Sequence, residues 1–248
     1  MTRDDFAAHH RAAEPLVLFN IWDAGSARAV AEAGAKAIAT GSLSLAGAQG
    51  FDDGEQMPFD ALLTTVRQIA GAIDLPLTVD IETGYASDLE GLVQNAVQLR
   101  DAGAIGCNLE DRVIGTEELR EVSEQCDRIR AVSDAGLFVN ARTDLFLGPL
   151  MAGQDPNREE LVEEAIERAA HYKDAGAGGL FVPGLSDPDL IRSLCDAVDL
   201  PVNIMRLDGM ASNAALGALG VARISHGPGP WRAAMQMLTD EARTHLEA

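Results

Sequence analysis

Residues 77–111 read LTVDIETGYASDLEGLVQNAVQLRDAGAIGCNLED, and this stretch contains the strand–helix–strand pattern that recurs along the chain. An apolar run at Leu77–Ile81 is followed by an amphipathic stretch at Asp88–Asp101, the turn Ala102-Gly103-Ala104 and a second apolar run at Ile105–Leu109. A strand, a helix and a second strand in this order form a βαβ unit, in which the two strands are parallel. Both runs end among carboxylates, which points to chemistry at that end of the sheet.

The same pattern extends in both directions and gives eight strand–helix units. The predicted strands are Leu16–Ile21, Ala37–Thr40, Leu77–Ile81, Ile105–Leu109, Leu137–Ala141, Gly179–Val182, Val202–Met205 and Ala222–Ile224. The predicted helices cover about Ala24–Ala33, Phe59–Ala72, Asp88–Asp101, Glu117–Asp134, Arg158–Asp174, Pro188–Ala197, Ser212–Leu219 and Trp231–Leu246. Eight units favour closure into a (β/α)₈ barrel of the α/β class, one domain over residues 1–248. An open doubly wound sheet is the alternative, which the missing G-x-G-x-x-G at the first helix disfavours.

Glycines mark the turns between these units. Gly34, Gly103, Gly176 and Gly220 each follow a predicted helix, where a residue with positive φ can end the helix before the next strand. The segment after the second strand, from Gly41 to Pro58, is rich in Gly and Ser and is predicted to be a loop.

Composition excludes several classes of protein. With 19 Lys and Arg against 39 Asp and Glu the formal charge is −20, which disfavours binding to nucleic acid or to an anionic membrane surface. No apolar run reaches the ~18 residues of a membrane span, and the first 14 residues lack an apolar signal segment. Cys107, Cys126 and Cys195 are too few and too widely spaced for a disulfide framework. Reduced thiols and a cytoplasmic location are therefore expected.

Polar residues gather where the predicted strands end, which is where active sites of such barrels lie. Asp80 and Glu82 project to the same side of the third strand, and Glu110 follows the fourth. Three neighbouring carboxylates repel one another unless a cation lies among them, and oxygen ligands suit Mg²⁺, with Mn²⁺ as the alternative. They are otherwise exposed loop carboxylates, which this acidic chain has in excess.

Two further groups follow strand ends. Arg142 is the only cation among these carboxylates, and its guanidinium suits a substrate carboxylate, unless it forms a structural ion pair with Asp144 or Glu110. Gly41 and Ser42 offer backbone N–H groups to a developing oxyanion, unless they simply turn the chain.

Four motifs together resemble the isocitrate lyase/phosphoenolpyruvate (PEP) mutase superfamily, especially its shorter mutase-like branch. They are Gly50–Glu55 (GFDDGE), Val79–Tyr85 (VDIETGY), Asn108–Asp111 (NLED) and Val139–Asp144 (VNARTD), and the likeness runs over nearly the whole chain. The resemblance implies a (β/α)₈ barrel, an essential Mg²⁺ and a homo-oligomer. Enzymes of this superfamily cleave or form a C–C or C–P bond beside an enolpyruvate-like intermediate.

The resemblance also implies roles for single residues. Asp80 resembles the main direct metal ligand, with Glu82 and Glu110 as supporting carboxylates, partly through water. Asp53, or the adjacent Asp52, matches a loop aspartate of the metal network. Arg142 matches the arginine that holds the substrate carboxylate, and the segment Thr40, Gly41 and Ser42 matches the amides that bind the 2-oxo oxygen.

The sequence departs from the family at two strand ends. The stretch Arg112–Glu118 lacks the Lys-Lys/Arg-Cys-Gly-His motif of the lyases, and Val182-Pro183-Gly184 replaces a usual His or Glu. Isocitrate and methylisocitrate cleavage are therefore not expected. Arg206 is a candidate for binding a distal carboxylate or phosphonate, and His226 for donating a proton, although each is equally a surface residue.

These observations predict a Mg²⁺-dependent lyase of a small 2-oxo or 2-hydroxy acid that acts through an enolpyruvate-like intermediate. Decarboxylation is favoured, because it needs no strong added acid such as the missing cysteine, and retro-aldol cleavage of a C–C bond comes next. The alternatives are a C–P bond enzyme of the phosphonopyruvate or PEP type, and a barrel that binds 2-oxo acids without turnover.

Overall fold

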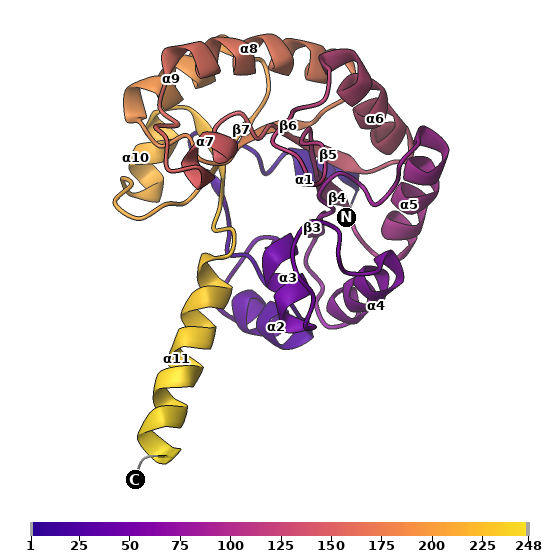
Figure 1. The fold of residues 1–248 in the computed structure, drawn as a ribbon, viewed down its shortest axis with the longest axis vertical. Helices are drawn as coiled ribbons and strands as arrows, with labels where there is room; N and C mark the ends of the chain where they lie inside the picture. Colours follow the sequence, from indigo (N-terminus) through magenta and orange to yellow (C-terminus); the bar gives the residue numbers. More distant parts are fainter. Residues whose placement is uncertain (1, 247–248) are drawn as a thin grey trace.

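The computed structural model describes residues 2–246 and has eight parallel strands at its centre. They are β1 (Leu16–Leu18), β2 (Ile38–Ala39), β3 (Leu77–Asp80), β4 (Gly106–Glu110), β5 (Phe138–Arg142), β6 (Gly179–Val182), β7 (Val202–Met205) and β8 (Val221–Ser225). They pair in the order β1-β8-β7-β6-β5-β4-β3-β2. The ring closes where Ile21 bridges Thr40, and the Ile21 amide donates to the Ala39 carbonyl at 2.8 Å. The predicted (β/α)₈ barrel is confirmed, and the open sheet is excluded (Figure 1).

Seven helices surround the ring. They are α2 (Ala24–Glu32), α4 (Phe59–Ala70), α5 (Leu89–Asp101), α6 (Val122–Asp134), α8 (Glu159–Asp174), α9 (Pro188–Ala197) and α10 (Asn213–Ala218). Side chains of Asp23, Asp88, Asp187 and Ser212 accept backbone N–H groups at four of their starts. The glycines at 34, 103, 176 and 220 have φ between 92° and 109°, so the predicted helix ends are confirmed.

The barrel is closed at its N-terminal end by a short helix that sequence analysis missed, α1 (Arg3–Ala7). Phe6 is fully buried and meets the ring of Phe138 edge-on at 5.2 Å, while His10 stacks on Phe138 at 4.6 Å. The opposite end of the barrel, where the strands finish, is not covered by α1.

Two segments differ from the prediction. The expected loop after β2 contains a helix, α3 (Ser42–Ala48). The ring of Trp231 packs directly on Gly47 of this helix, so closely that a Cβ at this position would lie 3.0 Å from the ring. A glycine chosen for close packing was thus misinterpreted as a loop signal. The helix expected from Glu117 begins only at Val122, since Arg112 and Leu119 pair as a small antiparallel bridge.

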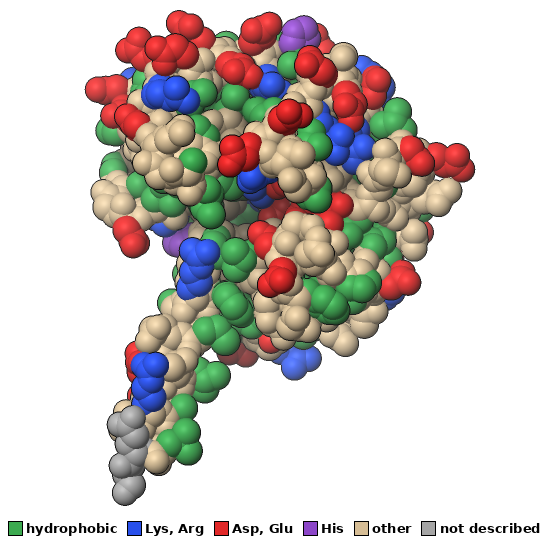
Figure 2. All heavy atoms as spheres, viewed as in Figure 1, with side chains coloured by type: hydrophobic (Ala, Val, Ile, Leu, Met, Phe, Trp, Pro, Cys, Tyr) green, Lys and Arg blue, Asp and Glu red, His purple; other side chains and the backbone are tan. Residues whose placement is uncertain are grey.

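The last helix, α11 (Gly229–Leu246), is present as predicted but does not cover the barrel. It extends away from the ring in Figure 1, and Pro230 is its only buried residue. Met237 and Leu238 are 63% and 59% exposed, and hydrophobic side chains run along the helix in Figure 2. Trp231, packed on Gly47, anchors its first turn.

The surface agrees with the composition. Acidic side chains are spread over the face shown in Figure 2. Within residues 2–246, no helix combines the length and the apolar character that a bilayer crossing requires. The three cysteines are free thiols, of which Cys107 is buried.

Candidate active site

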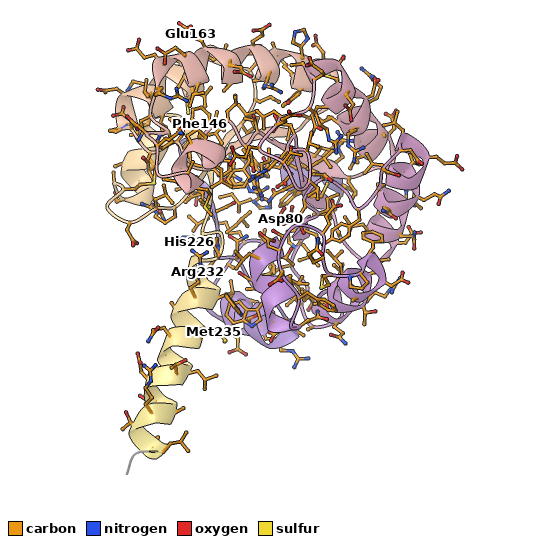
Figure 3. All side chains as sticks on the ribbon, in the orientation of Figure 1. Asp80, Phe146, Glu163, His226, Arg232 and Met235 are labelled. Atoms are coloured by element: carbon orange, nitrogen blue, oxygen red, sulfur yellow. The ribbon has the colours of Figure 1, made fainter. Side chains whose placement is uncertain are left out.

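A cavity of about 540 Å³ lies at the C-terminal ends of the strands. Strand ends from β2 to β8 each contribute to its wall through Ser42, Asp80, Glu110, Arg142, Phe181, Met205 and Ser225. The loop at residues 112–117, α7 (Leu147–Met151) and the first turn of α11 complete it. Asp80 points toward the middle of the ring in Figure 3, whereas Glu163 on α8 points outward.

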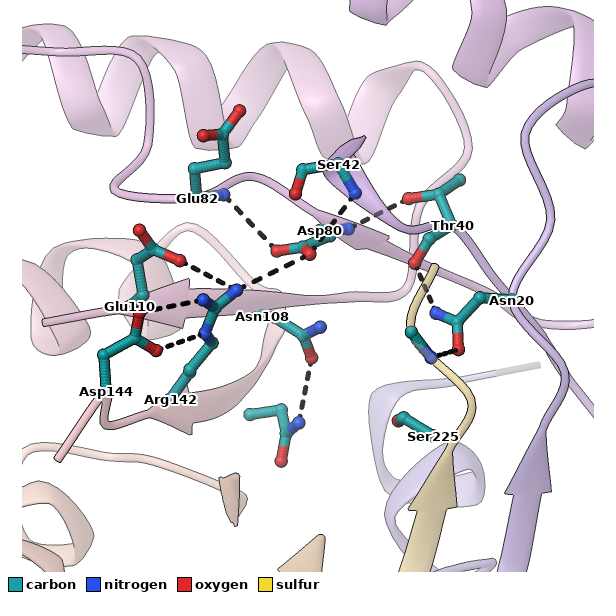
Figure 4. Close-up of polar contacts among 12 residues, drawn as sticks. Asn20, Thr40, Ser42, Asp80, Glu82, Asn108, Glu110, Arg142, Asp144 and Ser225 are labelled. Carbon is teal, nitrogen blue, oxygen red and sulfur yellow. Dashed lines mark hydrogen bonds and ion pairs between the residues drawn. The ribbon is translucent and has the colours of Figure 1, made fainter. Parts of the chain in front are cut away.

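Asp80 is a buried carboxylate without a close partner. Its Oδ2 lies 3.4 Å from the Ser42 amide and 3.9 Å from Arg142 Nη1, and its Oδ1 lies 3.5 Å from the Glu82 amide (Figure 4). Its own amide donates to Thr40 Oγ1 at 3.0 Å, which fixes the backbone. Since strong hydrogen bonds to a carboxylate are shorter than 3 Å, both oxygens have lone pairs available for a cation.

Arg142 is held between two acids. Its Nε and Nη2 donate to the two oxygens of Asp144 at 2.6 and 2.9 Å, and Nη1 lies 2.8 Å from Glu110 Oε2. Burial opposes its charge, but Asp144, then Glu110 and Asp80, raise the pKa of Arg142 above its ordinary value. The structural ion pairs left open by the sequence are therefore present. A guanidinium has five N–H groups, so at least two stay available for a substrate carboxylate.

Asp144 is held in position by a second buried aspartate, Asp111. Asp111, which is fully buried, accepts the Asp144 amide at 3.1 Å and the Tyr172 hydroxyl at 2.8 Å, and it lies 3.4 Å from Arg168 Nη1. Tyr172 and Arg168 lie on α8, far along the chain, so the sequence carried no signal that could have identified them. Their contacts hold the acid that orients Arg142.

Glu82 turns away from Asp80 and Arg142, as Figure 4 shows. Its Oε2 accepts the Glu55 amide at 2.9 Å, and its Oε1 accepts the Tyr85 hydroxyl at 3.1 Å. Glu55 Oε1 in turn accepts the Thr83 and Tyr85 amides at 3.0 and 2.9 Å. Glu55, Glu82 and Tyr85 have φ of 57°, 50° and 56°, so three strained residues lock this turn against the loop that carries Asp53.

The three carboxylates do not converge on one point, so the metal site at Asp80, Glu82 and Glu110, with Glu82 and Glu110 acting partly through water, stays a prediction. Like charges repel, and Glu82 and Glu110 take separate partners in the Glu55 amide and Arg142. Within residues 2–246, no three His, Cys, Asp or Glu side chains are arranged to hold a metal ion by themselves. The residues still fit Mg²⁺, which keeps several waters and takes one or two carboxylates together with substrate oxygens. Asp80 has the free oxygens for direct contact.

Metal affinity should depend on pH through Glu82. Burial, then the nearby Asp53, raises the pKa of Glu82 from 4.5 to about 7. Because the pKa of Glu82 is raised by folding, its contribution to the stability of the metal-free protein is fully present below about pH 4.5. This contribution is lost as the pH rises through 7. Cation binding has the opposite sign, because a cation competes with the proton. We expect the apparent Mg²⁺ affinity to fall by up to about tenfold per pH unit below 7, measured by calorimetry between pH 5.5 and 8. The variant Glu82→Gln should flatten this profile, and a flat profile in the parent would contradict the assignment.

Asn108 is a cavity residue whose role the sequence did not reveal. Its Oδ1 accepts Asn140 Nδ2 at 2.8 Å and Arg223 Nη2 at 3.1 Å. Because a guanidinium only donates, the oxygen of Asn108 must face Arg223 and its amide N–H groups must face the cavity. Asn108 pairs in register with Asp80 on the neighbouring strand, so these donors lie beside the free carboxylate. Arg223 is buried, and its ordinary pKa is lowered to about 9 by burial.

The variant Asn108→Asp should separate folding from binding. One Asp oxygen would pair with Arg223, so the unfolding temperature should not fall, while the other would present an acceptor in place of N–H donors. We expect oxalate affinity at saturating Mg²⁺ to drop by about tenfold or more, the equivalent of about 1.4 kcal/mol or more. Oxalate binding equal to that of the parent would show that the amide does not face the ligand.

The structure brings together most, but not all, of the predicted site. Gly41, Ser42, Asp53, Asp80, Glu82, Glu110 and Arg142 line the cavity. Thr40 does not, and it acts instead through the Asp80 amide. Arg206 is half-buried and bonds to the Ala211 carbonyl and the Asn213 side chain, and the ring of His226 lies 5.0 Å from that of Phe19. Neither residue reaches the cavity wall, so the structure gives no support to their predicted roles.

Two other arginines line the cavity in their place. Arg112 belongs to the loop after β4, where its Nε donates to the Thr116 carbonyl at 2.9 Å. Arg232 lies in the first turn of α11, near His226 in Figure 3. The sequence placed Arg232 in an outer helix, and only the outward course of α11 brings its first turn to the cavity.

Comparisons with known proteins agree with the fold and show the family of the chain. The phosphoenolpyruvate phosphomutase family pattern matches residues 6–246. An uncharacterized protein of Mycobacterium tuberculosis is 34% identical over 237 residues, covering 95% of this chain and 86% of that protein. The 2-methylisocitrate lyase of Escherichia coli is 32% identical over 196 residues, covering 76% of this chain and 64% of the lyase. A crystal structure of a candidate phosphonomutase from Burkholderia cenocepacia matches with a TM-score of 0.92 at 48% identity, covering 98% of this chain and 99% of that one.

Members of the isocitrate lyase/PEP mutase superfamily act as Mg²⁺-dependent enzymes that cleave or rearrange C–C or C–P bonds of 2-oxo acids. The four sequence motifs, the closed barrel and the family match lead to the same conclusion. This chain belongs to the phosphoenolpyruvate phosphomutase family, within the isocitrate lyase/PEP mutase superfamily.

Proposed function

We propose that the protein is a Mg²⁺-dependent lyase that breaks a carbon–carbon bond of a small 2-oxo or 2-hydroxy acid, with decarboxylation as the favoured reaction. The observation that carries the proposal is the meeting of a partner-poor carboxylate, Asp80, with spare N–H groups of Arg142 in one cavity. A 2-oxo acid would match both groups, because its carboxylate can accept N–H groups of Arg142 and its 2-oxo oxygen can bind a cation held by Asp80.

The cavity residues would bind the metal ion and the substrate separately. Asp80 would hold Mg²⁺ directly, and Glu82 and Glu110 would support it through water. Bound Mg²⁺ would supply Lewis-acid stabilisation of the oxygen that becomes the enolate. Arg142 would hold the substrate C1 carboxylate, and the Gly41 and Ser42 amides would bind the 2-oxo oxygen.

The cavity wall favours decarboxylation over reactions that need a strong acid. Among the cavity-lining residues that the structure describes, none is His, Cys, Lys or Tyr. In the decarboxylation of a β-keto diacid the C3–C4 bond breaks, CO₂ leaves, and the electron pair forms an enolate. Water then supplies the proton at C3, so no side chain has to donate it.

A turnover assay tests the proposal. The protein would be incubated with Mg²⁺ and oxaloacetate, a 2-hydroxy diacid panel or phosphonopyruvate, and pyruvate and CO₂ would be measured. Heat-denatured protein controls for the reaction that Mg²⁺ catalyses in solution. Pyruvate and CO₂ above this background support the proposal, and consumption of phosphonopyruvate alone would replace it with the C–P alternative, which the name of the 48% identical protein favours. Mg²⁺-dependent oxalate binding without any turnover would identify a binding barrel, which a described cavity wall without His, Cys, Lys or Tyr also allows.

A homo-oligomer is part of the proposal. The exposed Met237 and Leu238 on α11 have no covering surface within residues 2–246 and would be buried by a second copy. A monomeric molar mass measured by light scattering would refute the proposed homo-oligomer.

A further inference from the structure

The cavity has two chemically different sides. The carboxylates and Arg142 come from the ends of β3, β4 and β5, whereas the ends of β6 and β7 contribute Phe181, Pro183, Met205 and Leu207. In a closed ring of eight strands, strands four apart face each other, so β7 lies across from β3. An apolar wall therefore faces Asp80 across the cavity.

A short helix extends this wall. Leu147 and Leu150 of α7 also line the cavity, and α7 has no buried residue of its own. Its position is nevertheless fixed, because the preceding Phe146 is fully buried and a Cβ on Gly184 would lie 2.8 Å from the Phe146 carbonyl. The β6 loop thus packs directly against the start of α7, and its leucines are held over the cavity.

These apolar side chains are not part of the packed interior. Leu147, Leu150, Met205 and Leu207 are half-exposed, and they belong to neither hydrophobic cluster of the barrel. Their free surface faces the cavity that holds the proposed metal and carboxylate groups. Apolar surface enclosed in a cavity gains free energy when an apolar group covers it.

The cavity is larger than the acid that the polar side holds. Oxalate has six non-hydrogen atoms and would fill roughly 180 Å³ even at the ~30 Å³ of a liquid water for each atom. About two thirds of the 540 Å³ then stays open next to the apolar wall.

We propose that α7 and the ends of β6 and β7 form an alkyl-binding subsite, so that the substrate is a 2-oxo or 2-hydroxy acid with an apolar substituent at or beyond C3. This inference rests on the proposed function, since the polar side must hold the acid for its substituent to reach the wall. Arg112 and Arg232 also line the cavity, so a charged substituent is the competing case.

N-alkyl oxamates test the subsite with one constant head group. Their carboxylate and carbonyl reproduce the oxalate arrangement, and the nitrogen occupies the place of C3. Affinities of oxamate and its N-methyl, N-ethyl, N-propyl and N-isobutyl derivatives would be measured by calorimetry at saturating Mg²⁺. We expect affinity to rise by about fourfold per added carbon, which corresponds to about 0.8 kcal/mol per buried CH₂. N-carboxymethyl oxamate, equal in shape to the isobutyl compound, should bind more weakly than that compound.

Two matched double variants test whether the gain in affinity with chain length arises at α7. Leu147→Asn with Leu150→Asn should lose most of the gain in affinity with chain length, each derivative being compared with the same variant's own oxamate affinity. Leu89→Asn with Val93→Asn changes two apolar residues of α5 that are 43% and 40% exposed and lie outside the cavity, and it should keep the gain. If oxamate binds with Mg²⁺ but alkyl chains add nothing, or the carboxymethyl compound binds best, the subsite is refuted and the proposed function stands. If oxamate shows no Mg²⁺-dependent binding, both are refuted.

Discussion

Replacement of Asp80 by Ala is expected to abolish the Mg²⁺-dependent stabilisation of the protein by oxalate. Asp80 is the carboxylate with free oxygens, since its nearest contacts are at 3.4 Å or longer. In the parent, oxalate at a hundred times its dissociation constant adds about 2.7 kcal/mol to the free energy of unfolding. The variant should gain none of it in a thermal-shift titration with Mg²⁺, and its turnover should fall by about a thousandfold or more, since the metal supplies several kcal/mol.

The metal-free Asp80→Ala protein should be at least as stable as the parent. Removal of Asp80 relieves its repulsion with Glu82, and Ala keeps the backbone amide that donates to Thr40. The neighbouring aspartates give a matched control, because Asp53 lines the cavity and Asp52 does not. Asp52→Ala should respond to oxalate as the parent does, whereas Asp53→Ala should respond more weakly. An unchanged response of Asp80→Ala would contradict the metal assignment.

Replacement of Arg142 by Ala is expected to destabilise the fold and remove the ligand site together. The side chains of Glu110 and Asp144 are only 7% and 2% exposed, and both would lose their cation. Uncompensated buried charge of this kind costs about 3–5 kcal/mol, which urea unfolding would measure. Oxalate affinity should fall below detection, because the spare guanidinium N–H groups are lost with the side chain.

A neutralised variant separates these two losses. Arg142→Met combined with Glu110→Gln and Asp144→Asn removes the stranded charges and should recover most of the stability but none of the oxalate binding. Arg206→Ala is the matched arginine control, since this side chain does not line the cavity, and it should match the parent in both measurements. A triple variant that still binds oxalate would show that Arg142 serves the fold alone.

The sequence predicted the barrel because each unit carries its own signals. Strand periodicity, helix amphipathicity and the glycine after several of the helices all depend on near neighbours, and Gly34, Gly103 and Gly176 lie as expected. The helix at Ser42–Ala48 was missed because Gly47 has a partner, Trp231, nearly two hundred residues away. Local patterns do not reveal contacts of that separation.

The site was predictable in position but not in pairing. Strand ends placed Asp80, Glu110 and Arg142 around one cavity, as alternation along parallel strands requires. The turn of Glu82 toward the Glu55 amide depends on three positive φ angles, which no pattern in the sequence specifies. Arg112 and Arg232 were missed for a related reason, because loop paths and the outward course of α11 decide what reaches the cavity.

Calorimetric titration of oxalate into the parent protein, with Mg²⁺ and with EDTA, is the decisive test of the proposed metal site. We expect saturable binding with Mg²⁺ and at least about a hundredfold weaker binding with EDTA, because Asp80 and Arg142 together complete the site only around a cation. Equal binding under both conditions, or none under either, would contradict a magnesium site at Asp80 and with it the proposed lyase.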